Sequence, residues 1–257
     1  MQGLSNEVQE HVLRIQIRLF ACRERTRAGT DDEALHDLRI ALRQLRSLLR
    51  PLSTCGACAD LQQRAAELGR LTGPWRDLEV LQRYLQVQGL NDAAHSRQPL
   101  LLQAYAELPG NKTLVQLLSA LDEWPQQWRD AAASGELDDL RKLIRQRLRK
   151  DRKRLVQALL DPAHDRHCLR LLVKRLRYAA EAYPQLAGLS EHTRLQLKQA
   201  QSALGDWHDH WQWLQRAETE VDLQRCVPAW RDAMQSAEQQ ADLALRELSA
   251  GFVRVSR

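Results

Sequence analysis

Residues 36–50 read HDLRIALRQLRSLLR, in which leucine and arginine recur at the spacing of an α-helix. Because an α-helix turns about 100° per residue, one face of this helix collects four basic side chains within roughly 80°. We call these side chains the first row: His36, Arg39, Arg43 and Arg46. The opposite face holds Leu38, Leu42, Leu45 and Leu49. The stretch therefore predicts an amphipathic helix whose leucine face packs into a core.

The same pattern returns at residues 167–181, which read HCLRLLVKRLRYAAE. Its basic face is the second row: His167, Arg170, Lys174 and Arg177. A further block, GPWRD at 73–77, returns as GDWHD at 205–209. Two blocks that recur in the same order at nearly the same offset predict an internal duplication. The repeated unit would contain about four helices, of which the second carries the row and the fourth begins at the Gly-x-Trp block.

The composition favours an all-α fold with a substantial core. The chain has 257 residues, of which only 11 are Gly and 8 are Pro, and 44% are hydrophobic. We expect one domain over 1–257, with helical halves 1–133 and 134–257 that meet at Ser134-Gly135. The predicted helices are about 4–27, 31–50, 58–72, 75–88, 97–107, 112–133, 136–160, 164–183, 190–204, 207–225 and 229–250.

The cysteines and the hydropathy of the sequence indicate the cellular compartment and argue against membrane spans and a cysteine metal site. Five cysteines without a disulfide framework fit a reducing cytoplasm, where we expect the protein. Charged residues interrupt the first twenty positions and no run of 18 apolar residues occurs, so neither a signal peptide nor a membrane span is predicted. Cys55 and Cys58 have metal-ligand spacing but lack a second ligand pair, so we expect no metal there and no cofactor.

The two rows indicate a binding surface for a polyanion. Neither row contains an acidic residue, although acids four residues away would stabilise an ordinary solvated helix face and like charges there destabilise it. Arginine also presents donors in the geometry that phosphate oxygens accept. Further cations could extend the surface: the offset of the repeat maps Arg14 onto Arg145 and Arg18 onto Arg149.

At these residues the sequence resembles the CHAD family, the conserved-histidine α-helical domain. The matching segments are HDLRIALRQLRSLLR, GPWRDLEVL, HCLRLLVKRLRYAAE and LKQAQSALGDWHD, and the resemblance covers nearly the whole chain. It implies two pseudo-symmetric four-helix bundles with extra connecting helices, and a non-catalytic protein that binds inorganic polyphosphate and associates with polyphosphate granules. Lys198 matches a basic position of the family, whereas the first half has Ala66 there.

Two other functions stay open. The pairs His36-Asp37 and His208-Asp209 are shared with metal-dependent phosphohydrolases, although two-residue motifs arise readily by chance. A nucleic-acid binder is disfavoured because few aromatic residues lie among the cations to stack on bases. We expect Trp75 and Trp207 to anchor the core, since large aromatic side chains bury much area.

The row histidines predict a pH dependence. Neighbouring arginines disfavour protonation of histidine, and a bound polyphosphate would reverse that effect. Binding should therefore strengthen as pH falls from about 8 to 6.

Overall fold

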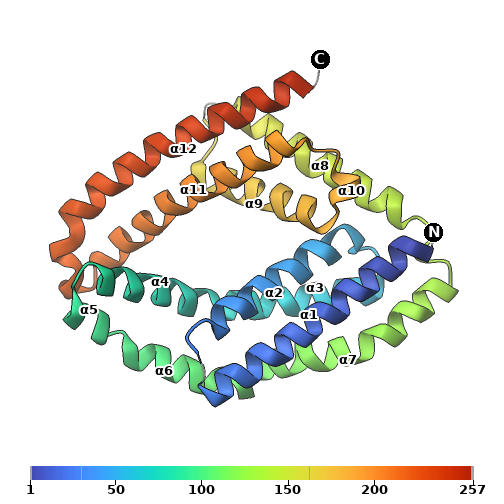
Figure 1. The fold of residues 1–257 in the computed structure, drawn as a ribbon, viewed down its shortest axis with the longest axis horizontal. Coiled ribbons are helices and arrows are strands. Elements are labelled where there is room, and N and C mark those ends of the chain that lie inside the picture. The colour runs from blue at the N-terminus through green and yellow to red at the C-terminus, as the bar shows by residue number, and fades with distance from the viewer. Residues whose placement is uncertain (1, 30, 162, 256–257) are drawn as a thin grey trace. The chain divides into compact units, whose positions relative to one another are not determined.

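The computed structural model describes residues 2–29, 31–161 and 163–255, and within these ranges the chain forms helices and no strand (Figure 1). The all-α fold predicted from composition and periodicity is confirmed. Contacts divide the chain into two compact units, residues 1–144 and 145–257. The predicted helix break at Ser134-Gly135 is found, because α7 ends at Ala133 and Gly135 has φ +79°, a left-handed conformation that suits glycine. The division between the two units falls later, between residues 144 and 145.

In the described part of the N-terminal unit there are seven complete helices and two 3₁₀ turns, η1 (Arg50–Leu52) and η2 (Leu108–Gly110). The helices are α1 (Gln2–Ala28), α2 (Ala34–Leu49), α3 (Gly56–Leu71), α4 (Gly73–Val87), α5 (Asn91–His95), α6 (Gln98–Glu107) and α7 (Lys112–Ala133). Helix α2 packs against α1 and α3, and α3 packs against α7. The row helix thus lies between two neighbours, which cover its leucine face.

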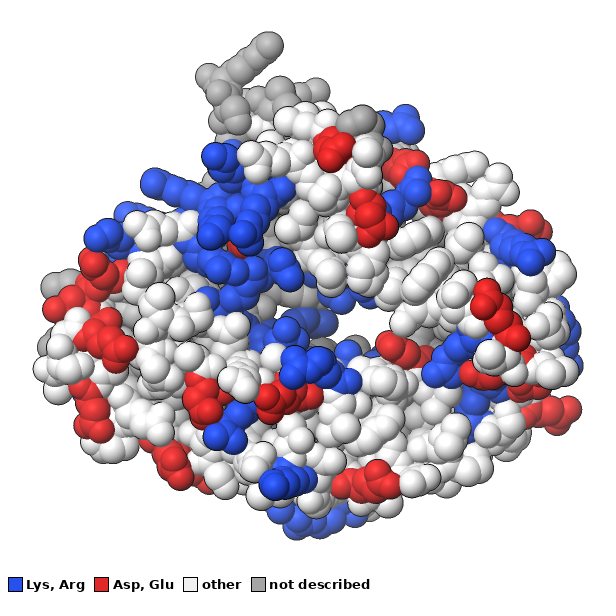
Figure 2. Space-filling view, turned by 180° about the vertical axis from the view of Figure 1, so that it is seen from behind, with Lys and Arg blue, Asp and Glu red and all other residues white. Residues whose placement is uncertain are grey.

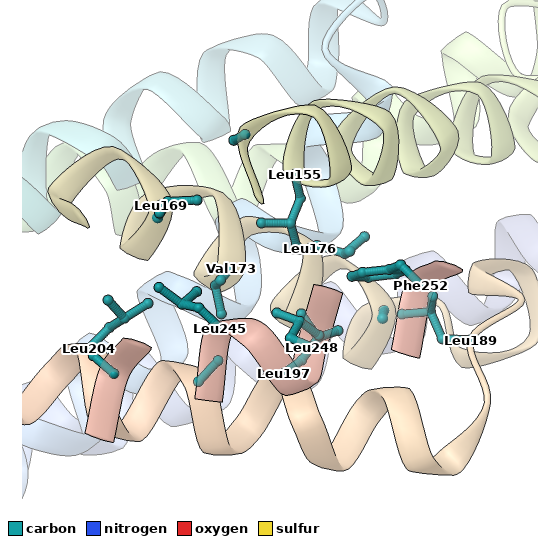
Figure 3. Packing of buried hydrophobic residues seen from close by; sticks show 14 residues of the cluster. Leu155, Leu169, Val173, Leu176, Leu189, Leu197, Leu204, Leu245, Leu248 and Phe252 are labelled. Carbon is teal, nitrogen blue, oxygen red and sulfur yellow. The ribbon is translucent and has the colours of Figure 1, made fainter. Parts of the chain in front are cut away.

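The C-terminal unit contains most of α8 (Leu140–Leu160), whose first turn belongs to the N-terminal unit. It continues with α9 (Arg166–Ala182), α10 (Pro184–Ala187), α11 (Glu191–Ala217), the 3₁₀ segment η3 (Val221–Cys226) and α12 (Val227–Val255). Helix α11 packs along α12 and against α9. Figure 3 shows side chains of α9, α11 and α12 converging with Leu155 of α8 on one core.

Both predicted leucine faces are buried. Leu38, Leu42, Leu45 and Leu49 are each at most 2% exposed, and in α9 Leu169, Val173, Leu176 and Ala180 are buried as well. Each buried leucine contributes about 1.5–3 kcal/mol relative to an exposed one. This burial fixes the rotation of α2 and α9, and so directs the two rows away from the cores.

The largest error among the predicted helix boundaries lies in α11. The sequence places a break at Gly205-Asp206, but α11 runs without interruption from Glu191 to Ala217. A glycine costs a helix only about 1 kcal/mol, and burial of Leu204 and His208 on either side of Gly205 offsets that cost. The equivalent place in the N-terminal unit does break, because Pro74 has no amide hydrogen to continue the helix.

The predicted role of the repeated tryptophans is also wrong. Trp75 and Trp207 are only partly buried, whereas Trp124, Trp128 and Trp230 are at most 1% exposed and fill the cores. Position in the repeat therefore does not mark the core tryptophans. No helix in the described ranges is both long and apolar enough to cross a membrane.

Candidate functional site

The first row lies across the junction of α3 and α4. Arg39 Nη1 donates hydrogen bonds to the Gly69 carbonyl and to Thr72 Oγ1, both at 3.0 Å. A Cβ atom at Gly69 would come within 3.4 Å of Arg46 Nη1. Arg39 therefore has a structural role, because it satisfies a carbonyl that the end of α3 leaves without a helical partner. His36, Arg39 and Arg43 are partly buried and Arg46 is exposed.

Helix α4 brings a further cation to the first row. The pKa of His36 is lowered, first by burial and then by the charge of Arg76. Arg76 and Arg43 also help to lower the pKa of Arg39, although burial is the larger cause. Arg76 pairs with Glu79 at 2.8 Å. The structure thus places Arg76 beside the first row, and sequence reasoning missed this residue although it lies in the repeated GPWRD block.

The second row lies on α9, with His167 exposed and Arg170, Lys174 and Arg177 partly buried. Arg177 is held in place by its neighbours. It donates to Gln201 Oε1 at 2.8 Å and pairs with Glu181 at 2.7 Å. These contacts orient its guanidinium group before any ligand arrives.

His208 joins the second row from α11. Its side chain is 7% exposed, and its ring centroid lies 5.3 Å from that of His167. Burial lowers the pKa of His208 to about 4, with further lowering by the charges of Arg170, His167 and Lys174. Sequence reasoning considered His208 only as a metal ligand. No group of three or more His, Cys, Asp or Glu side chains able to hold a metal ion occurs in the described part of the chain.

Lys198 lies near one end of the second row. With Arg177 and Arg194 it lines a surface pocket of about 730 Å³ between α9, α10 and α11. Glu181 and Glu191 line the same pocket, so its charge is mixed. The structure therefore brings Lys198 together with Arg177, in a pocket that also contains acidic side chains.

The predicted outer cations differ in their surroundings. Arg14 is exposed and pairs with Glu10 at 2.5 Å, while Arg18 donates to Gln44 of α2 at 3.0 Å. Arg145 and Arg149 are exposed one turn apart on α8. Figure 2 shows a dense group of Lys and Arg side chains around α8, with few acidic ones among them. The α8 cations thus belong to a basic surface, whereas Arg14 is compensated by a carboxylate.

Comparison with known proteins identifies the family of the chain. The family model described as CHAD domain matches residues 12–218, a span that includes both rows, Arg76, His208 and Lys198. The chain belongs to the CHAD family. The crystal structure of the CHAD domain from the plant Ricinus communis superposes with a TM-score of 0.67 and 22% identity, over 96% of this chain and 91% of that one. No curated protein matched the chain.

The CHAD match and the superposition together cover the row helices and their neighbours. At 22% identity the similarity to the plant domain shows the common fold. The CHAD family itself is associated with polyphosphate binding. The candidate binding residues of this CHAD protein are therefore taken from the geometry of its own two rows.

Proposed function

We propose that this protein binds inorganic polyphosphate without catalysis, through the first row in one unit and the second row in the other. The observation that carries the proposal is the pair of rows themselves. Each is a line of cations without an acidic member, on a helix whose opposite face is buried in a core. Mutual repulsion along each row is a cost that a polyanionic ligand relieves.

The chemistry of the rows suits a chain of phosphates. Arginine and lysine donate charge-assisted hydrogen bonds to phosphate oxygens, and binding releases condensed counterions. Burial is the main cause of the lowered pKa values of His36 and His208, and neighbouring cations lower both further, although Glu33 and Asp37 oppose that lowering at His36. An anionic ligand would find this field attractive. The family association with polyphosphate supports the same ligand.

The proposed site has an inner and an outer part. Both rows, with Arg76 and His208, form the inner part because the structure groups these side chains in each unit. Lys198, Arg18, Arg145 and Arg149 form the outer part. Arg14 also belongs to it, although its ion pair with Glu10 reduces its contribution. The location that we propose is the cytoplasm, with association to polyphosphate granules.

A binding titration tests the proposal. The wild type is titrated with polyphosphates of several lengths at a series of salt concentrations, and compared with Arg43→Gln/Arg170→Gln/Lys174→Gln. By analogy with single-stranded nucleic acid, each lost contact lowers the slope of log affinity against log salt by about 0.7, so the triple variant should lose about 2. Arg39 is left intact because it supports α3.

A matched control removes the same charge elsewhere. Three exposed cations away from the rows are replaced by Gln: Lys112, Arg129 and Arg246. This variant should keep most of the affinity. Equal losses in the two triple variants would show that net charge, not the rows, governs binding, and would contradict the proposal.

The alternatives give different results. A duplex DNA that displaces bound polyphosphate at equal phosphate concentration would favour a nucleic-acid binder. Release of orthophosphate with Mg²⁺ or Mn²⁺, abolished by Asp209→Asn, would favour a metal-dependent phosphohydrolase. We expect neither result.

A further inference from the structure

The second row carries an aromatic group on α11. The ring of His208 lies 5.3 Å from His167 and 5.7 Å from Trp211, with the latter pair nearly parallel at 16°. The ring centroid of Trp207 lies 6.3 Å from that of His208. Trp211 is 43% exposed. A continuous set of rings thus leads from a cationic row to an exposed indole.

The N-terminal unit has no such group at the equivalent positions. The offset between the GPWRD and GDWHD blocks maps His208 onto Arg76 and Trp211 onto Glu79. Glu79 is buried, pairs with Arg76 and accepts a hydrogen bond from Tyr105. An internal ion pair therefore stands where the C-terminal unit has stacked rings. The packing of the repeat does not require an aromatic side chain at this place.

Trp211 leaves much of its indole exposed, unlike Trp213 and Trp230 of the same unit. Large aromatic side chains gain free energy by burial, and three other tryptophans of this chain are almost fully buried. His208 holds one side of the indole in a fixed orientation. A fixed, exposed ring beside cations is the arrangement in which proteins stack a nucleobase while basic groups bind its phosphates.

We propose that the C-terminal unit binds a nucleoside oligophosphate, with the phosphates on Arg170 and Lys174 and the base stacked on Trp211. Both cations act electrostatically on His208, the ring that contacts Trp211, so the two parts of the site adjoin. The inference rests on the proposed function, because the phosphates would occupy the same second row. A mononucleoside ligand fits better than a strand, since Trp211 is the exposed tryptophan of the group while Trp207 is half-buried.

Calorimetric titrations test this inference with ligands that differ only in the base. The probes are ATP and ribose 5′-triphosphate in metal-free buffer, with long-chain polyphosphate as the reference for the proposed function. Stacking strengthens binding from about fivefold to about a hundredfold, so ATP should bind at least fivefold more tightly than ribose 5′-triphosphate. Trp211→Leu should remove that difference without changing the affinity for ribose 5′-triphosphate or polyphosphate.

Two further variants separate stacking from general effects. Trp211→Phe keeps an aromatic face and should retain part of the preference for ATP. Leu243→Ala changes an exposed apolar residue on α12 and should leave the preference intact. Loss of the preference in Leu243→Ala would overturn the assignment to Trp211.

The outcomes distinguish this inference from the proposed function. Polyphosphate binding with no preference for ATP over ribose 5′-triphosphate would overturn the nucleoside inference alone. Absence of binding to every phosphate probe would overturn both. Tighter binding of a four-nucleotide single strand than of ATP, again lost in Trp211→Leu, would replace the mononucleoside by a strand and overturn the inference as stated.

Discussion

Replacement of His208 by asparagine should remove a measurable part of the acid sensitivity of the C-terminal unit. The pKa of His208 is lowered from its ordinary value of 6.5 to about 4, mainly by burial. The folded protein therefore binds fewer protons than the unfolded chain between these two values. The stability contributed by neutral His208 is complete above about pH 6.5 and is lost as pH falls toward 4.

The size of the effect follows from the two pKa values. At pH 5 nearly every unfolded chain carries a protonated histidine, whereas about nine in ten folded molecules keep His208 neutral. The corresponding loss of unfolding free energy between pH 7 and pH 5 is about 2 kcal/mol. His208→Asn should lose about that much less than the wild type over the same interval, whatever its stability at pH 7.

Urea denaturation at pH 7, 6 and 5 and constant ionic strength measures this difference. Tryptophan fluorescence follows the unfolding of both units, because Trp124 and Trp128 are buried in the N-terminal unit and Trp213 and Trp230 in the C-terminal unit. His192→Asn is the matched control, because His192 is exposed on the same helix. Equal losses of stability in the wild type and in His208→Asn would refute the reasoning.

Three other measurements test the fold and the site. In urea denaturation, Arg39→Gln should lower the free energy of unfolding by about 2 kcal/mol more than Arg43→Gln does, because Arg39 donates hydrogen bonds at the end of α3. Equal values for the two variants would contradict a structural role for Arg39. Leu248→Ala should cost about 2–5 kcal/mol in thermal unfolding, whereas exposed Leu243→Ala should cost little. Polyphosphate affinity should rise from pH 8 to pH 6, and replacement of both row histidines by asparagine should flatten that rise.

The helix faces could be predicted from the sequence because they depend on local periodicity. The apolar residues between Leu38 and Leu49 and those between Leu169 and Ala180 recur at helical spacing, and the structure buries both sets. The boundary at Gly205 could not be predicted in the same way. A glycine within good helix formers permits either outcome, and the choice depends on the packing of α11 against α9 and α12.

The inner part of the site was only partly accessible from the sequence. Spacing along one helix predicts that His167, Arg170 and Lys174 share a face, whatever the rest of the fold does. His208 lies beside them because of the register in which α11 packs against α9. The spacing of residues along a single helix does not predict that register. Sequence reasoning paired His208 with its neighbour Asp209 instead, and thereby missed its contact with the second row.

The contacts of the cations imply an order of importance within the site. Arg39 is fixed by its hydrogen bonds to Gly69 and Thr72, and Arg177 by its hydrogen bond to Gln201, although Glu181 offsets part of the charge of Arg177. A side chain that is already ordered loses less conformational entropy when it binds a ligand, so its hydrogen bonds contribute more to affinity. Cations such as Arg145, exposed on α8, must be ordered at the moment of binding. They should therefore act mainly through the long-range field that guides a polyanion to the rows.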